Sequence, residues 1–226
     1  MIIGLVNQKG GVGKTTLSVN IAHALTMDSF GKKINGEVIK NRVLVVDADP
    51  QQSSLKWSTY REAKASFDVI SLPSKYLPRD LSSISQNYDF VIIDGPHNVS
   101  DLSRACIMAS DLVVLPCTPS IYDIWASEDT LKLIQESEPY KHNILPVFLI
   151  NMKIVNTNIG KDVEEYLAKY KVPVLKSTIC RRVTFTESCT RGLTVFEVAP
   201  DCKAAQEVIE VTKNILEECG INEEKF

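Results

Sequence analysis

Residues 7–25, NQKGGVGKTTLSVNIAHAL, combine the residue types that bind a phosphate group. A glycine-rich turn between an apolar run and a helix points backbone N–H groups at an anion, and the helix dipole adds to their field. Glycine is needed where a Cβ would block the approach of a phosphate or where φ is positive. The stretch therefore predicts a nucleotide-phosphate loop with the backbone of Gly10, Gly11, Val12 and Gly13 around the phosphates.

The side chains of this loop add chemistry of their own. Lys14 is expected to bridge the terminal phosphates, and the Thr15 hydroxyl is expected to ligate Mg²⁺. Thr16 follows in the first turn of the helix and is expected to contact the nucleotide. The match to G-x-x-x-x-G-K-[ST] is imperfect, because Gln8 stands at the first glycine and is followed by an additional cation, Lys9. A lysine that points away from its own phosphates needs a more distant anion.

Three aspartates follow β-rich runs and could face the same ligand. Asp47 and Asp49 come at the end of Val43–Val46, and their spacing of two puts both carboxylates on one face. Asp94 follows Phe90–Ile93. Because the carboxyl ends of parallel strands form the ligand crevice, all three can approach a nucleotide on the loop. Transfer of a phosphoryl group to water needs Mg²⁺, fixed donors, positive charge and one oriented water, and these residues suit each need.

Alternating strands and helices would position these groups. Several apolar runs are nearly continuous, which is typical of strands covered on both faces, and stretches with helical spacing separate them. We expect one α/β domain over residues 1–226, a doubly wound and mostly parallel sheet of seven to eight strands flanked by helices. The candidate strands are Ile2–Val6, Val43–Val46, Phe67–Ile70, Phe90–Ile93, Leu112–Leu115, Leu145–Ile150 and Val172–Leu175.

The segment 31–41, GKKINGEVIKN, lengthens the connection between the first helix and the second strand. Its Asn35-Gly36 pair is a turn signal, so we expect a small hairpin or a lengthened surface loop there.

Composition excludes several classes of protein. The chain has 226 residues, 44% of them hydrophobic and 23% charged, with a net charge of −3. No apolar run approaches the roughly 20 residues that span a bilayer, and no signal peptide is evident, so we expect a cytoplasmic protein. The six cysteines form no C-x-x-C pair, which argues against a disulfide or zinc framework. The mildly acidic balance argues against a whole-surface nucleic-acid binder and leaves room for a local basic patch.

The phosphate loop resembles that of the deviant Walker-A ATPases, which reads K-G-G-x-G-K-[ST]. The resemblance extends to D-x-D-P at residues 47–50 and to FVIIDGP at residues 90–96, and it covers almost the whole chain. Many family members have D-T-P where this chain has D-G-P. The resemblance implies a Mg²⁺-dependent P-loop ATPase that binds ATP and ADP and hydrolyses ATP slowly.

The resemblance also implies residue roles. Lys14 would serve its own site, whereas Lys9 would reach across a two-fold axis to the nucleotide of a partner protomer. Asp47 and Asp94 would hold Mg²⁺ through water, and Asp49 would position or activate the attacking water. Asn151 ends the Leu145–Ile150 run with an amide that suits adenine's N6 and N7 edge, and family members contact the purine with an asparagine there. A turn residue is the alternative for Asn151.

Within this family, the sequence is most similar to the ParA-type partition ATPases. STICRRVTFTESCTRGLTVFE resembles their paired basic residues, short helix and G-x-x-V. The chain begins almost directly at its first strand, so we expect it to lack an N-terminal helix-turn-helix. The tail NILEECGINEEKF is acidic, whereas a membrane-surface helix carries Lys and Arg on its polar face, so no stable membrane anchor is expected.

ParA-type members imply an ATP-dependent homodimer that binds DNA without sequence preference and so associates with the nucleoid. A centromere-binding ParB-like partner would stimulate hydrolysis and release the DNA, driving plasmid or chromosome partition. Non-specific binding needs several basic residues facing phosphates. The candidates are Lys176, Arg181, Arg182, Lys203 and Lys213, with a second patch in the segment 32–42.

Two alternatives stay open. The first is a MinD-like or polar-positioning scaffold that uses the same switch on a protein or membrane surface. The second is an ATP-dependent ligase or kinase similar to the dethiobiotin-synthetase group, although that group lacks the early lysine.

Overall fold

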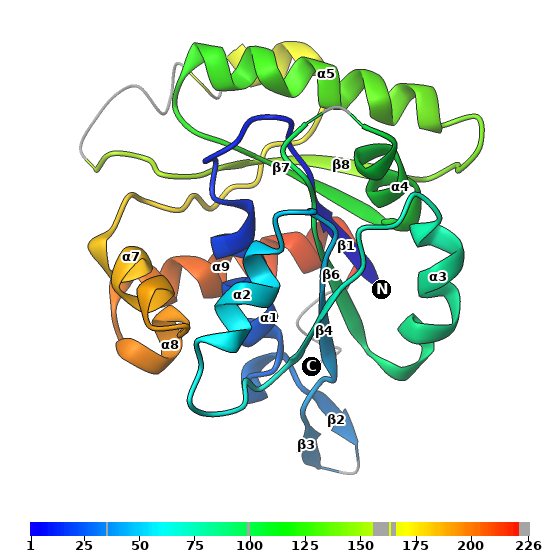
Figure 1. The fold of residues 1–226 in the computed structure, drawn as a ribbon. Helices are drawn as coiled ribbons and strands as arrows, with labels where there is room; N and C mark the ends of the chain where they lie inside the picture. Colours follow the sequence, from blue (N-terminus) through cyan, green and yellow to red (C-terminus); the bar gives the residue numbers. More distant parts are fainter. Residues whose placement is uncertain (35, 99, 156–162, 164–165, 222–226) are drawn as a thin grey trace.

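The computed structural model describes residues 1–34, 36–98, 100–155, 163 and 166–221, and its centre is a six-stranded sheet. All of its strand pairs are parallel, in the order β5-β4-β6-β1-β7-β8 (Figure 1). The α/β fold class predicted from the sequence is thereby confirmed. The strands are β1 (Ile2–Leu5), β4 (Val43–Asp47), β5 (Asp68–Ser71), β6 (Phe90–Asp94), β7 (Leu112–Cys117) and β8 (Leu145–Ile150).

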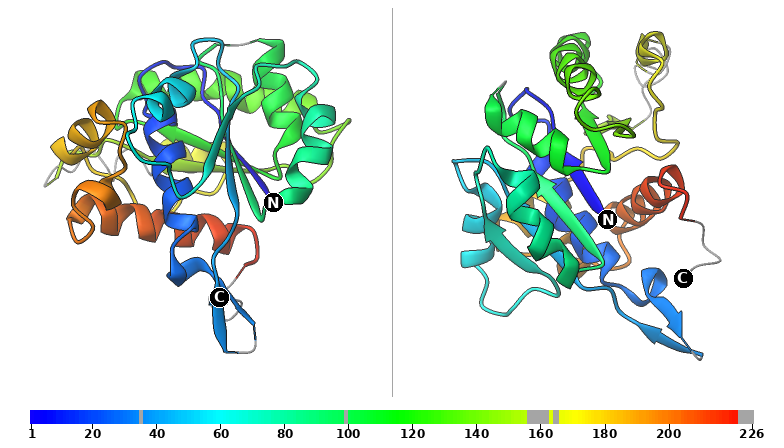
Figure 2. Two further views of the ribbon diagram at one scale, coloured as in Figure 1. Left: turned by 60° about the horizontal axis from the view of Figure 1, so that its bottom comes forward. Right: turned by 90° about the vertical axis from the view of Figure 1, so that its right-hand side faces the viewer.

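Successive side chains of a buried strand pack into apolar clusters on opposite faces of the sheet. In β4, Val43 and Val45 pack into one apolar cluster, whereas Leu44 and Val46 pack into the other. Helices α1, α2, α8 and α9 supply the first cluster, and α3, α4 and α5 supply the second, so helices cover both faces (Figure 2). The helices are α1 (Lys14–Leu25), α2 (Ser53–Thr59), α3 (Leu77–Ile84), α4 (Asp101–Ala109), α5 (Ile121–Ser137), α7 (Val183–Thr190), α8 (Val195–Val198) and α9 (Lys203–Glu218). Among the described residues, no helix is both long and apolar enough to span a membrane.

The predicted count of seven to eight strands is too high for the described part of the sheet. The segment 172–175 makes one isolated parallel bridge to β8, between Val174 and Phe148, and forms no strand. Phe148 N–H donates to the Pro173 carbonyl, and Leu175 N–H donates to the Phe148 carbonyl. Pro173 itself has no N–H to extend the ladder. The segment therefore covers the edge of β8 without becoming a seventh strand.

The segment 31–41 contains two short antiparallel strands, β2 (Lys32–Ile34) and β3 (Glu37–Ile39), in a separate two-stranded sheet. Gly36 has a φ of 84°, a conformation that favours glycine. Asn35, the other half of the turn signal, lies outside the described residues. The hairpin projects from the body of the molecule (Figure 1).

An ion pair fixes the segment that follows α2 against the α7–α8 segment, which borders the site described below. The Arg61 guanidinium donates to both carboxylate oxygens of Glu197, at 2.5 and 3.0 Å, and to the Gly192 carbonyl. Burial alone would raise the pKa of Glu197, but hydrogen bonds from Arg61 and from the Thr194 N–H lower it to about 2. Trp57 Nε1 adds a bond to the Leu193 carbonyl.

Candidate nucleotide-binding site

The loop after β1 has the geometry of a phosphate cradle. Gly11 and Gly13 have φ values of 80° and 90°, and a Cβ at Gly13 would stand 2.4 Å from Asn151 Nδ2. These two positions therefore need glycine. Asn7, fully buried, anchors the loop from below. Its Nδ2 donates to the Pro116 carbonyl and to Ser127 Oγ, and its Oδ1 accepts the Lys9 N–H.

Lys14 lies buried inside the loop. Its ammonium donates to the carbonyls of Asn7 (2.9 Å) and Lys9 (3.1 Å). Burial lowers the pKa of Lys14, while the charges of Asp94 and Asp49 oppose that shift. The loop thus curls around one cation, which is the arrangement that a triphosphate requires.

A cavity of about 330 Å³ opens beside this cation. Gly10, Thr15 and Thr16 line it from the loop, and Asp49, Gly95 and His97 from the loops after β4 and β6. Asp47 of β4 pairs in register with Asp94 of β6. Both residues therefore stand at the edge of the sheet where the sequence predicts a ligand crevice. His97 was not among the predicted site residues.

The residues at the predicted Mg²⁺ position fit a hard cation. Thr15 Oγ1 and Ser54 Oγ both donate to Asp94 Oδ2, at 2.7 and 2.6 Å. Asp94 Oδ1 is buried and has no hydrogen-bond partner among the described residues. Burial raises the pKa of Asp94 to about 6. An unpartnered carboxylate oxygen next to a threonine hydroxyl is a suitable pair of oxygen donors for Mg²⁺.

Asp47 has a structural duty in addition to the predicted one. Its Oδ1 accepts the Asp49 N–H at 3.2 Å, and its Oδ2 accepts the Leu55 N–H at 2.9 Å, near the start of α2. Burial raises the pKa of this carboxyl as well. Asp47 therefore orders the turn that carries Asp49, and its contribution to Mg²⁺ stays a prediction.

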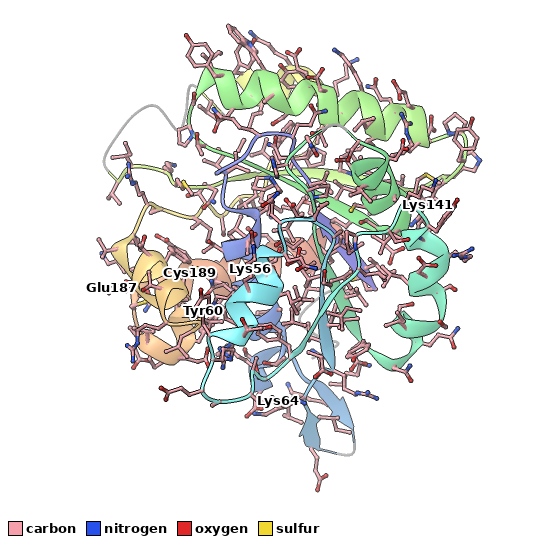
Figure 3. The ribbon with its side chains drawn as sticks, in the orientation of Figure 1. Lys56, Tyr60, Lys64, Lys141, Glu187 and Cys189 are labelled. Carbon is pink, nitrogen blue, oxygen red and sulfur yellow. The ribbon has the colours of Figure 1, made fainter. Side chains whose placement is uncertain are left out.

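Asn151 also holds backbone. Its Nδ2 donates to the Val12 carbonyl at 2.7 Å, and its Oδ1 accepts the Met152 N–H at 2.9 Å. The side chain lines a second cavity, of about 510 Å³, whose other walls include Leu17, Phe185 and Cys189. Cys189, labelled on α7 in Figure 3, lies 3.7 Å from Thr16 Oγ1. This largely apolar cavity next to the phosphate loop has the lining that a planar base needs, while the Asn151 amide is already engaged by the loop.

Lys9 lies away from the cavity that its own loop forms. Its ammonium pairs with Asp123 of α5, a buried carboxylate that also accepts a hydrogen bond from Thr118 Oγ1 at 2.6 Å. The Lys9 side chain is 41% exposed. Its ammonium is therefore at the rim of the site. Its partner, Asp123, is 114 positions away in the sequence.

The five predicted DNA contacts differ in their pairing. Arg182 donates to both carboxylate oxygens of Glu207, while Lys176 pairs with Glu217 and Lys213 with Glu210. Over the described ranges, Arg181 and Lys203 form no ion pair. Arg181 is exposed and lines the second cavity.

The Asp94→Asn variant tests the electrostatic cost of the site. A carboxyl whose pKa is raised from 3.8 to about 6 stabilises the fold less as pH rises through this interval, because the charged form is disfavoured inside the protein. Between about pH 4 and about pH 8, we expect the free energy of unfolding of nucleotide-free Asp94→Asn to gain about 2 kcal/mol relative to the unmodified chain. Urea unfolding at both pH values measures this gain. An identical difference at both would contradict it.

Comparisons with known proteins agree with this geometry. The family model described as CobQ/CobB/MinD/ParA nucleotide binding domain matches residues 3–195. The "Maintenance of carboxysome distribution protein A" of Halothiobacillus neapolitanus is 27% identical over 219 residues, which cover 95% of each chain. The sporulation initiation inhibitor protein Soj of Bacillus subtilis is 28% identical, and the match covers 95% of this chain and 97% of Soj.

Solved structures share the fold. The complex of a Cyanothece McdA variant with ATP superposes with a TM-score of 0.76 at 16% identity, covering 98% of this chain and 96% of that one. The septum site-determining protein MinD from Pyrococcus horikoshii, complexed with Mg-ADP, gives a TM-score of 0.73 at 20% identity and covers 97% of both chains. The family resemblance drawn from the motifs is confirmed: the chain belongs to the CobQ/CobB/MinD/ParA nucleotide-binding family, as a P-loop ATPase of the ParA/MinD type.

Proposed function

We propose that the protein is an ATP-dependent molecular switch. Two copies clasp a pair of Mg-ATP molecules, the dimer binds DNA without sequence preference, and slow hydrolysis to ADP and phosphate returns the subunits to monomers. This cycle would drive the partition of a plasmid or chromosome, with a ParB-like centromere-binding protein as the stimulating partner and the nucleoid as the site of the ATP-bound form.

The position of Lys9 carries the proposal. Lys14 occupies the interior of the loop, so the loop already has the cation that its own phosphates need. The Lys9 ammonium instead lies on Asp123 at the rim, with 41% of its side chain exposed. Release from Asp123 would free a charge for an anion outside this subunit, and a second copy's triphosphate facing the first is such an anion.

The remaining residues divide the work of hydrolysis. Lys14 and the N–H groups of residues 10–16 would bind the phosphates, while Thr15, Asp94 and, through water, Asp47 would hold the cation. Mg²⁺, when bound, would neutralise charge on the phosphate oxygens. Asp49 lines the phosphate cavity and would orient the attacking water. Asn151 and the cavity beside it would receive the base.

DNA binding is supported by a smaller set of residues than the sequence indicates. Arg181 and Lys203 have charges that no acidic neighbour among the described residues neutralises, whereas Lys176, Arg182 and Lys213 have glutamate partners. A dimer would present each unpaired charge twice, so affinity for DNA phosphates would depend on the bound nucleotide.

A positioning scaffold is the second candidate function. The relative from Halothiobacillus neapolitanus is named for carboxysome distribution, so one protein of similar sequence is associated with a cargo other than a plasmid. Lys176, Arg182 and Lys213 also pair with glutamates, which would leave less positive charge for DNA phosphates and so favours this alternative. In this alternative, the same ATP-dependent dimer acts on a protein or membrane surface.

The Lys9→Ala variant tests the dimer. We expect it to bind ADP as the unmodified chain does but to stay monomeric with a non-hydrolysable ATP analogue, because each site would lose the cation lent by its partner. Analytical ultracentrifugation with ADP and with the analogue measures both states, and Lys56→Ala, an exposed lysine of α2 (Figure 3), is the matched control. An equal loss of ADP affinity in Lys9→Ala would show that the lysine serves only its own chain.

The Arg181→Ala variant tests the DNA surface. We expect retention by unrelated DNA sequences in ATP to weaken uniformly, and the slope of log K against log salt to fall by about 1 for each lost phosphate contact. Lys132→Ala, on α5 at the other face of the sheet, is the control and should leave the slope unchanged. A protein that dimerises in ATP and is not retained by DNA at low salt would establish the scaffold function instead.

A further inference from the structure

An aspartate and a histidine from different loops meet at the edge of the phosphate cavity. Asp49 follows β4 and His97 follows β6, and these strands are neighbours in register at Asp47 and Asp94. The short loops bring His97 Nδ1 to 3.0 Å from Asp49 Oδ2, and both residues line the cavity of about 330 Å³. No motif used above requires a histidine at this position.

The contact leaves the Asp49 carboxylate with little freedom. Its Oδ1 accepts the Gln51 N–H at 2.8 Å, so a local turn fixes one oxygen, and His97 engages the other. Only 12% of the Asp49 side chain is exposed, against 49% for His97. The imidazole therefore caps a recessed carboxylate from the solvent side of the cavity.

Without this cap, the carboxylate has a competing partner. Asp49 and Lys14 line the same cavity. Burial lowers the pKa of Lys14, and the negative charges of Asp94 and Asp49 both act against that shift. The other charged groups on this side are Asp47, held by backbone N–H groups, and Asp94, held by two hydroxyls. An Asp49 side chain that lost its hydrogen bond to His97 would be drawn toward Lys14 and away from a water at the terminal phosphate.

We propose that His97 is a positioning residue for hydrolysis, whose Nδ1–H holds Asp49 Oδ2 toward the attacking water and ties the loop after β4 to the loop after β6. This inference rests on the proposed ATPase activity. The ring acts through Asp49 and transfers no proton itself.

Three substitutions separate this role from a merely structural one. Asparagine can place an N–H near the position of Nδ1, glutamine places its amide farther out, and alanine has no donor. We expect kcat for ATP hydrolysis to fall about 10-fold or more in His97→Ala and His97→Gln, and to recover most of that loss in His97→Asn. KM for ATP and the affinity for Mg-ADP should not change. His142→Ala, in the exposed turn before β8, is the control.

A double variant tests the coupling. If His97 acts only through Asp49, His97→Ala should cost nothing further in an Asp49→Asn background. An additional loss there, or an equal loss in His97→Asn and His97→Ala, would overturn the proposal by giving the ring a separate role. Unchanged kcat in all three His97 variants would also overturn it. Absence of ATPase activity in the unmodified chain would instead refute the proposed function.

Discussion

Lys14→Ala is expected to weaken the binding of both ATP and ADP by about 100-fold or more, since truncation of one member of a buried charge contact costs several kcal/mol. The ammonium is the only lysine or arginine group that the described structure places among the lining residues of the phosphate cavity. It also joins the Asn7 and Lys9 carbonyls, so its removal loosens the loop itself. Isothermal titration with each nucleotide in the presence of Mg²⁺ measures the loss.

Two controls separate loss of charge from loss of the fold. Lys56→Ala removes an exposed lysine of α2 and should leave both affinities unchanged. Thermal unfolding of nucleotide-free Lys14→Ala should remain cooperative, because the sheet and its helices do not depend on this side chain. Nucleotide affinity within threefold of the unmodified chain would contradict the assignment of the loop.

Asp49→Ala is expected to lower kcat about 100-fold or more while leaving ATP binding and dimer formation intact, because orienting the water matters only during hydrolysis. The variant would therefore accumulate as a long-lived ATP dimer. Single-turnover release of phosphate measures the chemical step, and sedimentation after ATP addition measures the dimer's lifetime.

Asp49→Asn is the informative companion to the alanine variant. An asparagine oxygen can still accept the Gln51 N–H, so the local turn persists while the negative charge is lost. Similar slow turnover in both variants would assign the effect to the carboxylate. Normal hydrolysis in Asp49→Ala would remove this residue from the mechanism.

The local sequence was sufficient to predict the six strands of the sheet and the phosphate loop. The run Val43–Val46 is apolar at every position, which is typical of a strand buried on both faces, and the structure buries all of its residues. Gly11 and Gly13 have positive φ values, the property for which glycine was predicted. Val172–Leu175 was wrong as a strand, because one proline in a four-residue run prevents a continuous ladder.

Contacts between distant positions could not be predicted in the same way. Lys9 and Asp123 are 114 positions apart, and neither residue type identifies the other as its partner. Glu217 and Glu207 of α9 pair with Lys176 and Arg182, so helix packing decides that these two charges are neutralised. The Lys213–Glu210 pair, in contrast, lies within α9 at a spacing of three and could have been read from the sequence. His97 could have been found from strand order, because a residue three beyond Asp94 must lie near the loop that follows Asp47.

The β2–β3 hairpin offers a convenient place for a label. Helix α1 leads from the phosphate loop toward the end of the molecule where the hairpin projects (Figure 1). A fluorescent peptide spliced between the two strands would thus sit at the end of the molecule away from the phosphate loop. Light microscopy of living cells could then follow the protein's movement while its nucleotide-binding residues stay unmodified.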